Sequence, residues 1–271
     1  GEQEYGTART GTSGLILEAA TWSFDSWGEN LVGCSTGDGR VYEWSGSTAS
    51  AAAVIANAPT NNRFVFVSEQ RHLVVLGAGG DPRQVQWSDA EDNTDWTPSS
   101  VNQAGDFVLN TNGHLRCAVK TRGETLILTS TDAHVKRFIG SPLVFSFDRV
   151  GTQCGVAGPN AAVAVNGTVA WMGNDAKFYV YNGVVQNIPC EIEDWVESQF
   201  NKIKQTEVYC GTLAEHSEVW WFFPANDGET KYAVWNYKQN IWYIGELDRT
   251  AWLDRGVWGH PVAVSSDGYL Y

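Results

Sequence analysis

Four carboxylates fall within seven positions of the sequence, at Asp89, Glu91, Asp92 and Asp95, inside the segment 87–96. Carboxylate oxygens at this density could bind a hard cation such as Ca²⁺. An acidic turn facing solvent explains the same residues without a ligand, and it is the interpretation that we favour. The sequence therefore predicts no metal site here, although a cation in the turn stays an open alternative.

Other residue types that carry chemistry are scattered. The histidines show no metal-ligand spacing, and they are His72, His114, His134, His216 and His260. The glycines of 77–80 lack the spacing of a nucleotide-binding loop and predict a hairpin, while the glycosylation-like triplet 166–168 predicts a turn. Nucleophile elbows, phosphate-binding loops and metalloprotease helices do not occur in the sequence. We therefore predict no catalytic residue, no cofactor site and no metal site, and a protein that is not an enzyme.

Composition limits the classes of partner and compartment. The chain of 271 residues has 43% hydrophobic and 18% charged residues, with a formal net charge of −13, which disfavours binding DNA through a basic patch. Five widely spaced cysteines predict reduced, mostly buried thiols, and they are Cys34, Cys117, Cys154, Cys190 and Cys210. No stretch is long and apolar enough for a membrane span, and no signal peptide is recognisable.

The elements that must position these residues repeat along the chain. An Asp in a turn is followed by alternating apolar residues, and an aromatic residue stands six positions after the Asp, at Trp44, Trp87, Phe138 and Tyr181. Including a looser fifth copy and an incomplete sixth, the Asp residues are Asp38, Asp81, Asp132, Asp175, Asp227 and Asp267. They recur every 40 to 52 residues, with a mean of about 46, which is the length of a propeller blade.

An apolar run precedes each of the first five turns, at 30–35, 72–76, 125–129, 168–172 and 218–223, and each predicts a buried strand. Asp and Gly suit the tight turn between two strands, and aromatic residues suit packing between neighbouring sheets. We expect an all-β fold, a β-propeller of six blades. An ordinary β-sandwich is the alternative, but it gives no reason for a repeat of this length.

One segment breaks the strand pattern. In 189–205 the apolar residues Ile192, Trp195, Val196, Phe200 and Ile203 recur at helical spacing, which predicts one amphipathic helix inserted between the fourth and fifth repeats. We expect it to pack against the core, with a recognition role as the alternative. Residues 1–271 are expected to form one propeller domain of a longer polypeptide, because the chain opens with Gly1 and stops inside an expected strand.

The acidic segment also has a loose resemblance of its own. Residues 87–96 resemble the Asp-box hairpin of sialidase-type propellers, although Asn93 stands where that motif has Gly and the motif occurs once. Asp boxes are structural even in sialidases, and no arginine-rich motif precedes the first repeat. Together with the abundance of Trp, the resemblance leaves a glycan-binding or glycan-cleaving propeller as the alternative function.

Several short segments of the sequence are similar to segments of a known family. They are 85–89 (VQWSD), 96–98 (WTP), 102–106 (NQAGD), 155–162 (GVAGPNAA), 171–173 (WMG), 218–224 (EVWWFFP), 236–237 (NY) and 249–252 (RTAW), with Trp242, Gly245 and Leu247. Spread over roughly 22–271, they resemble the tail hub or nozzle proteins of short-tailed bacteriophages, also called packaged-DNA stabilisation proteins. None of these segments contains a catalytic residue.

The resemblance implies a structural protein of the phage tail that supports assembly, DNA retention and DNA passage during ejection. It implies a homo-oligomeric ring, commonly a hexamer, that contacts portal or adaptor proteins and tail-fibre or tail-tip proteins. Double-stranded DNA would pass without specific binding, and an acidic lumen would favour its sliding. The expected location is the virion, with assembly in the cytoplasm of the bacterial host. A cellular propeller scaffold ranks last, since the signatures of WD40 repeats do not occur.

Overall fold

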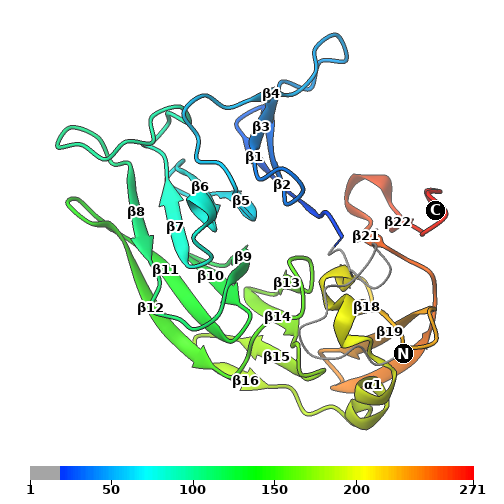
Figure 1. Cartoon of the computed structure of the whole chain (residues 1–271). Coiled ribbons are helices and arrows are strands. Elements are labelled where there is room, and N and C mark those ends of the chain that lie inside the picture. The colour runs from blue at the N-terminus through cyan, green and yellow to red at the C-terminus, as the bar shows by residue number, and fades with distance from the viewer. Residues whose placement is uncertain (1–18) are drawn as a thin grey trace, which may run out of the picture.

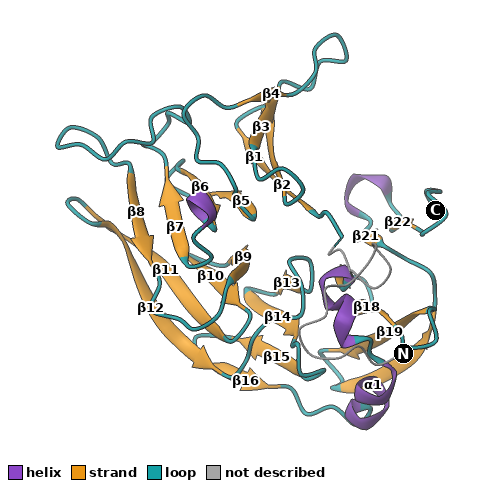
Figure 2. Cartoon of the chain, viewed as in Figure 1, coloured by secondary structure: helices purple, strands orange, loops and turns teal. Residues whose placement is uncertain are grey.

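The computed structural model describes residues 19–271, which form small antiparallel sheets that follow one another round a centre (Figure 1). Figure 2 shows strands throughout and little helix. The first three sheets have four strands each, namely β1 (Trp22–Trp27), β2 (Asn30–Ser35), β3 (Val41–Trp44) and β4 (Ala53–Val54); β5 (Phe64–Val67), β6 (Leu73–Leu76), β7 (Gln84–Trp87) and β8 (Gly105–Val108); and β9 (Leu115–Lys120), β10 (Glu124–Thr129), β11 (Asp132–Gly140) and β12 (Val144–Thr152).

The remaining strands form two further four-stranded sheets and one small sheet. These are β13 (Ala162–Val165), β14 (Thr168–Met172), β15 (Phe178–Tyr181) and β16 (Val185–Asn187); β17 (Tyr209–Leu213), β18 (Glu218–Pro224), β19 (Thr230–Asn236) and β20 (Ile241–Glu246); and the pair β21 (Ala251–Leu253) and β22 (Val262–Val264). The first strand of each sheet packs against the first strand of the next, so these strands lie innermost. The prediction of an all-β propeller is confirmed.

The number of complete sheets differs from the prediction of six blades. The described residues contain five four-stranded sheets, whereas the sixth repeat forms a two-stranded sheet extended by one bridge between Val264 and Leu270. The sequence prediction counted Asp turns. A turn with its two flanking strands supplies only two of the four strands of a complete sheet.

The repeated Asp residues are turn residues, and their side chains hold the turns in a common way. In five of the six repeats, Oδ1 of the Asp accepts a hydrogen bond at 2.9–3.1 Å from the backbone N–H two residues later, in Arg40, Arg83, Lys177, Glu229 and Tyr269. In four repeats, a side chain four residues later approaches the second oxygen at 2.5–3.2 Å, and these donors are Tyr42, Tyr179, Lys231 and Tyr271. An Asp side chain that bonds nearby N–H groups favours a turn over continued strand. The local chemistry therefore explains the repeat.

The segment 189–205 is less helical than its apolar spacing predicts. It contains the short helix α1 (Glu193–Gln199), followed by the 3₁₀ segment η2 (Lys202–Glu207). Val196 and Phe200 are buried, but Ile203 is 64% exposed. The helix starts four residues after Pro189 and ends at Phe200, whose backbone is extended. The apolar stripe thus covers two turns and stops there. Two more 3₁₀ segments, η1 (Ala78–Gly80) and η3 (Gly256–Trp258), lie in loops, the first where the sequence predicts a hairpin.

The core lies between neighbouring sheets, as expected for stacked blades. Its largest cluster joins sheets three, four and five, and Trp171, Phe178 and Trp221 are fully buried in it. Aromatic residues at the sixth position of the repeat differ in burial, because Trp87 and Tyr181 are buried whereas Phe138 is 44% exposed. All five cysteines are free thiols, and four of them are buried.

Candidate functional site

The acidic segment 87–96 uses its carboxylates to hold its own loop. Asp89 accepts hydrogen bonds from the backbone N–H groups of Ala90 and Gln103, and Asp92 accepts from Thr94. Asp95 accepts from Asn102, and Glu91 pairs with Arg71. Each carboxylate has a different partner, so the four side chains do not converge on one point. Across residues 19–271, no three His, Cys, Asp or Glu side chains are grouped so that they could hold a metal ion.

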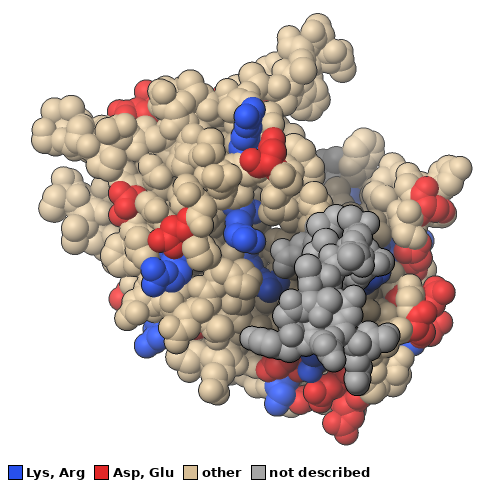
Figure 3. All heavy atoms as spheres, viewed as in Figure 1, with Lys and Arg blue, Asp and Glu red and all other residues tan. Residues whose placement is uncertain are grey.

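The centre of the propeller carries basic side chains. A small hollow of about 50 Å³ is lined there by residues of the first four sheets and their links, including Arg63, His114 and Arg116. Figure 3 shows basic side chains towards the centre of this face and many acidic ones towards its rim. The described residues that line the hollow include no Asp or Glu, so the acidic side chains lie outside it. The hollow lies within one chain, so it does not test the acidic lumen expected for an oligomeric ring, which stays a prediction.

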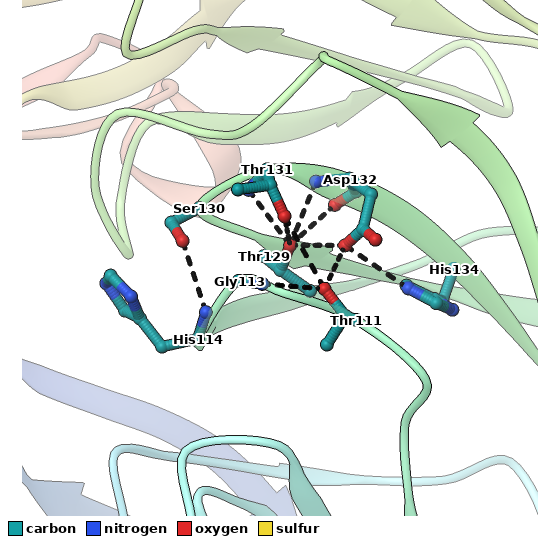
Figure 4. A network of polar contacts seen from close by, with 8 residues as sticks. All are labelled: Thr111, Gly113, His114, Thr129, Ser130, Thr131, Asp132 and His134. Carbon is teal, nitrogen blue, oxygen red and sulfur yellow. Dashed lines mark hydrogen bonds and ion pairs between the residues drawn. The ribbon is translucent and has the colours of Figure 1, made fainter.

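A buried polar network surrounds Asp132, the Asp of the third repeat (Figure 4). Oδ1 of Asp132 accepts hydrogen bonds from the hydroxyl of Thr111 at 2.8 Å and from that of Thr129 at 2.5 Å. The hydroxyl of Thr129 also accepts from the backbone N–H groups of Thr131 and Asp132. Two hydroxyls and one carboxylate oxygen thus fix the end of strand β10 and the start of β11.

His134 lies beside this network without extending it. Its Nε2 is 3.2 Å from Oδ1 of Asp132, but it approaches outside the hydrogen-bonding direction of the ring. Burial lowers the pKa of His134 below its usual value more than the neighbouring Asp132 raises it, so the imidazole is neutral. The hydroxyls of Thr111 and Thr129 donate to the carboxylate rather than to the imidazole. Within residues 19–271 the network therefore lacks the histidine-to-hydroxyl contact of a Ser–His–Asp hydrolase.

The third repeat departs from the turn pattern of the other repeats. Asp132 is the first residue of β11, and among residues 19–271 no backbone N–H bonds its side chain as in the other five turns. The residue four positions later is Lys136, which lies further along the same extended strand with its Nζ 3.4 Å from the ring centre of Phe145. Oδ2 of Asp132 has no hydrogen-bond partner within residues 19–271 (Figure 4).

A polar pocket opens beside this uncapped oxygen. It has a volume of about 500 Å³ and lies between the turns of sheets three and four, with Asp132, Arg149, Gln153 and Asp175 in its wall. The walls are fixed by hydrogen bonds between the two sheets, including Asn174 Nδ2 to the carbonyl of Ser130 at 2.8 Å. This pocket was not predicted from the sequence. The third Asp lacks both a following Gly and a Tyr four positions later, but Asp81 lacks them as well, so the sequence carries no signal specific to this pocket.

An apolar groove of similar size lies on the outer side of sheets two and three. Its wall includes Phe107 of β8, Phe147 of β12 and Leu143 of the loop that joins β11 to β12. The rings of Phe107 and Phe147 stack at 4.8 Å. Exposed apolar side chains surround the groove, with Leu143 68% and Ile139 52% exposed. We call this surface the outer apolar groove.

Comparisons with known proteins inform the fold. No family model matches this chain, and no curated protein matches its sequence. Among solved structures, virginiamycin B lyase from Staphylococcus aureus is 4% identical with a TM-score of 0.58, over 92% of this chain and 82% of that chain. A streptogramin B lyase is 5% identical with a TM-score of 0.57, over 92% and 81%.

The SapL1 lectin, solved in complex with alpha methyl fucoside, is 12% identical with a TM-score of 0.53, over 94% of this chain and 96% of that chain. At such low identity these likenesses concern the fold alone. The chain is similar in fold to propellers whose names indicate different activities, two lyases and a lectin. A separate finding is that no helix within the described residues is long and apolar enough to cross a membrane.

Proposed function

We propose that this chain is a structural, non-enzymatic domain of a bacteriophage tail, of the hub or nozzle type, acting in tail assembly, DNA retention and DNA passage. The sequence segments that resemble tail hub or nozzle proteins support the assignment to a phage tail. The outer apolar groove is the structural observation that carries the assembly role. A contiguous exposed apolar surface is typical of a protein–protein interface. The hydroxyls around Asp132 donate to its carboxylate and not to His134, which favours a structural role for this network over catalysis.

The proposed partners are further copies of the chain in a ring, sixfold as the resemblance to the family implies, together with portal, adaptor, tail-fibre or tail-tip proteins. The proposed location is the virion. The net negative charge fits a protein past which DNA slides without sticking, since like charge repels the phosphate backbone.

We also propose that the sixth repeat belongs to a sixth blade. Support comes from its turn, in which Asp267 accepts from the N–H of Tyr269 and from the hydroxyl of Tyr271, as in the complete sheets. Strand β21 packs on β17 as the inner strands of earlier sheets pack on one another. Helix α1 is proposed to be a packing insertion, because Val196 is fully buried and Trp195 meets Phe223 edge to face at 6.2 Å.

Electron microscopy of the protein from its full reading frame tests the assembly role, combined with pull-down of adaptor and tail-fibre proteins. We expect rings, and we expect Phe107→Asp with Leu143→Asp to abolish ring formation or partner binding, because two carboxylates would enter an apolar interface. Val184→Asp is the matched control, since Val184 is 60% exposed and lies outside the groove. A stable monomer without affinity for either partner would contradict the proposal.

A further inference from the structure

The pocket between sheets three and four presents hydrogen-bonding groups of both kinds. Oδ2 of Asp132 is an acceptor, while Arg149 supplies a guanidinium and Asn112 and Gln153 supply side-chain amides. The side chain of Asp132 is 6% exposed, so its carboxylate is fixed in place before any ligand arrives. Arg149 is exposed and forms no ion pair with any of residues 19–271. Both groups are thus available to a ligand.

The same carboxylate position is closed in other repeats. Oδ2 of Asp38 is capped by the hydroxyl of Tyr42, and Oδ2 of Asp175 by that of Tyr179. In the third repeat Asp132 already belongs to strand β11, so Lys136, four extended residues further along, is too distant to cap this oxygen. A buried acceptor is therefore open at this turn, and a polar pocket adjoins it.

The chemistry of the wall selects the class of ligand. The two carboxylates Asp132 and Asp175 oppose a phosphate or other anion, whereas Arg149 opposes a metal cation or an amine. The described residues that line the pocket include no aromatic or large aliphatic side chain, which disfavours an apolar ligand. A neutral group with several hydroxyls both donates to a carboxylate and accepts from guanidinium and amide groups.

We propose that this pocket binds a neutral saccharide unit, with two ring hydroxyls held between Oδ2 of Asp132 and the guanidinium of Arg149. A volume of about 500 Å³ lies within the range of small-ligand sites. Side-chain amides of Asn112 and Gln153 hold further hydroxyls at the rim. The assignment does not depend on the tail-assembly proposal, because it uses a different surface of the molecule from the outer apolar groove.

Chemical-shift perturbation on the ¹⁵N-labelled chain tests the site. The probes are the α-methyl glycosides of glucose, galactose, mannose, fucose and N-acetylglucosamine, with inorganic phosphate and CaCl₂ as charged probes. We expect saturable shifts at the amides of Thr131 and Gln153 with at least one glycoside and none with the charged probes. Absence of glycoside shifts, or shifts at these amides caused by phosphate or Ca²⁺ instead, would overturn the proposal.

Variants separate the site from general surface effects. Arg149→Met is expected to weaken glycoside binding about tenfold, as loss of one charge-assisted hydrogen bond does. Asp132→Asn is expected to weaken it as much, with thermal unfolding recorded to check that the network still folds. The matched controls are Arg40→Met and Asp38→Asn, at a turn whose carboxylate is capped. Unchanged affinity in Arg149→Met, or equal losses in Arg40→Met, would contradict the assignment.

Discussion

Lys136 is a lysine that the fold buries at an electrostatic cost. Its side chain is buried, and burial lowers the pKa of Lys136 to about 7, although Glu69 acts in the opposite direction. The ring of Phe145 at 3.4 Å offsets part of the lost hydration. The buried ammonium of Lys136 is therefore expected to lower the stability of the folded chain at neutral pH.

Replacing Lys136 by Met should stabilise the protein at neutral pH. The unfolded chain binds the proton of Lys136 up to about pH 10.5 and the folded chain only to about pH 7, so folding expels a proton between these values. The variant should gain about 2 kcal/mol in unfolding free energy at or below pH 7, and the gain should shrink as pH rises towards 10. Urea unfolding of both proteins across this range measures it.

Lys238→Met, at an exposed position, controls for the loss of a surface charge and should change stability little at any pH. A less stable Lys136→Met protein at pH 7 would mean that the contact between the ammonium and the Phe145 ring outweighs the burial of the charge.

At the scale of the element, the Asp turn with its cap is the unit that defines each hairpin. In the fourth repeat, Tyr179 donates to Oδ2 of Asp175 at 2.6 Å and approaches the carbonyl of Gln153 at 3.2 Å. The hydroxyl therefore ties the turn of sheet four to the link that leaves sheet three. Turns built in this way are specified by residues within a few positions of each other.

Removing this cap should weaken the hairpin measurably. Tyr179→Phe leaves a carboxylate oxygen of Asp175 without its donor, and we expect a loss of about 1.5 kcal/mol in unfolding free energy. The urea midpoint, followed by tryptophan fluorescence, measures the change. Tyr243→Phe is the matched control, since Tyr243 is 45% exposed, and it should shift the midpoint little. Equal stability of the two variants would show that the cap is replaced by water.

At the scale of the whole molecule, stability should be uneven round the propeller. The largest core cluster joins sheets three to five, whereas in the two-stranded sheet only Ala263 is buried and Leu253 is 59% exposed. Stacked blades share their cores with immediate neighbours, so a small sheet at one end of the series has the least buried apolar contact.

Hydrogen exchange followed by mass spectrometry should show this gradient. We expect the amides of β21 and β22 to exchange fastest among the strands, and those of β10 and β14 slowest, since local opening requires less free energy where fewer side chains are buried. Protection in β21–β22 equal to that in β14 would contradict the gradient. The comparison is internal to one sample, so it requires no variant.

Much of the blade centre could be predicted from the sequence. The expected strand 30–35 is β2, and 168–172 is β14, and their turns hold the predicted Asp38 and Asp175. The prediction worked because turn chemistry and strand alternation are local. The inner and outer strands were not assigned, since their pairing joins residues whose patterns are weaker, such as the short β4 and β16.

The sequence by itself determined that hairpins begin at repeated Asp turns and that the chain is a β-propeller. Only the tertiary structure decided that the six Asp residues are not equivalent. Asp132 belongs to strand β11 and accepts from the hydroxyls of Thr111 and Thr129, and the turn of sheet four supplies the opposite wall of the pocket. Partners that come from other strands and other sheets are set by packing, and packing between distant segments leaves no local pattern in a sequence.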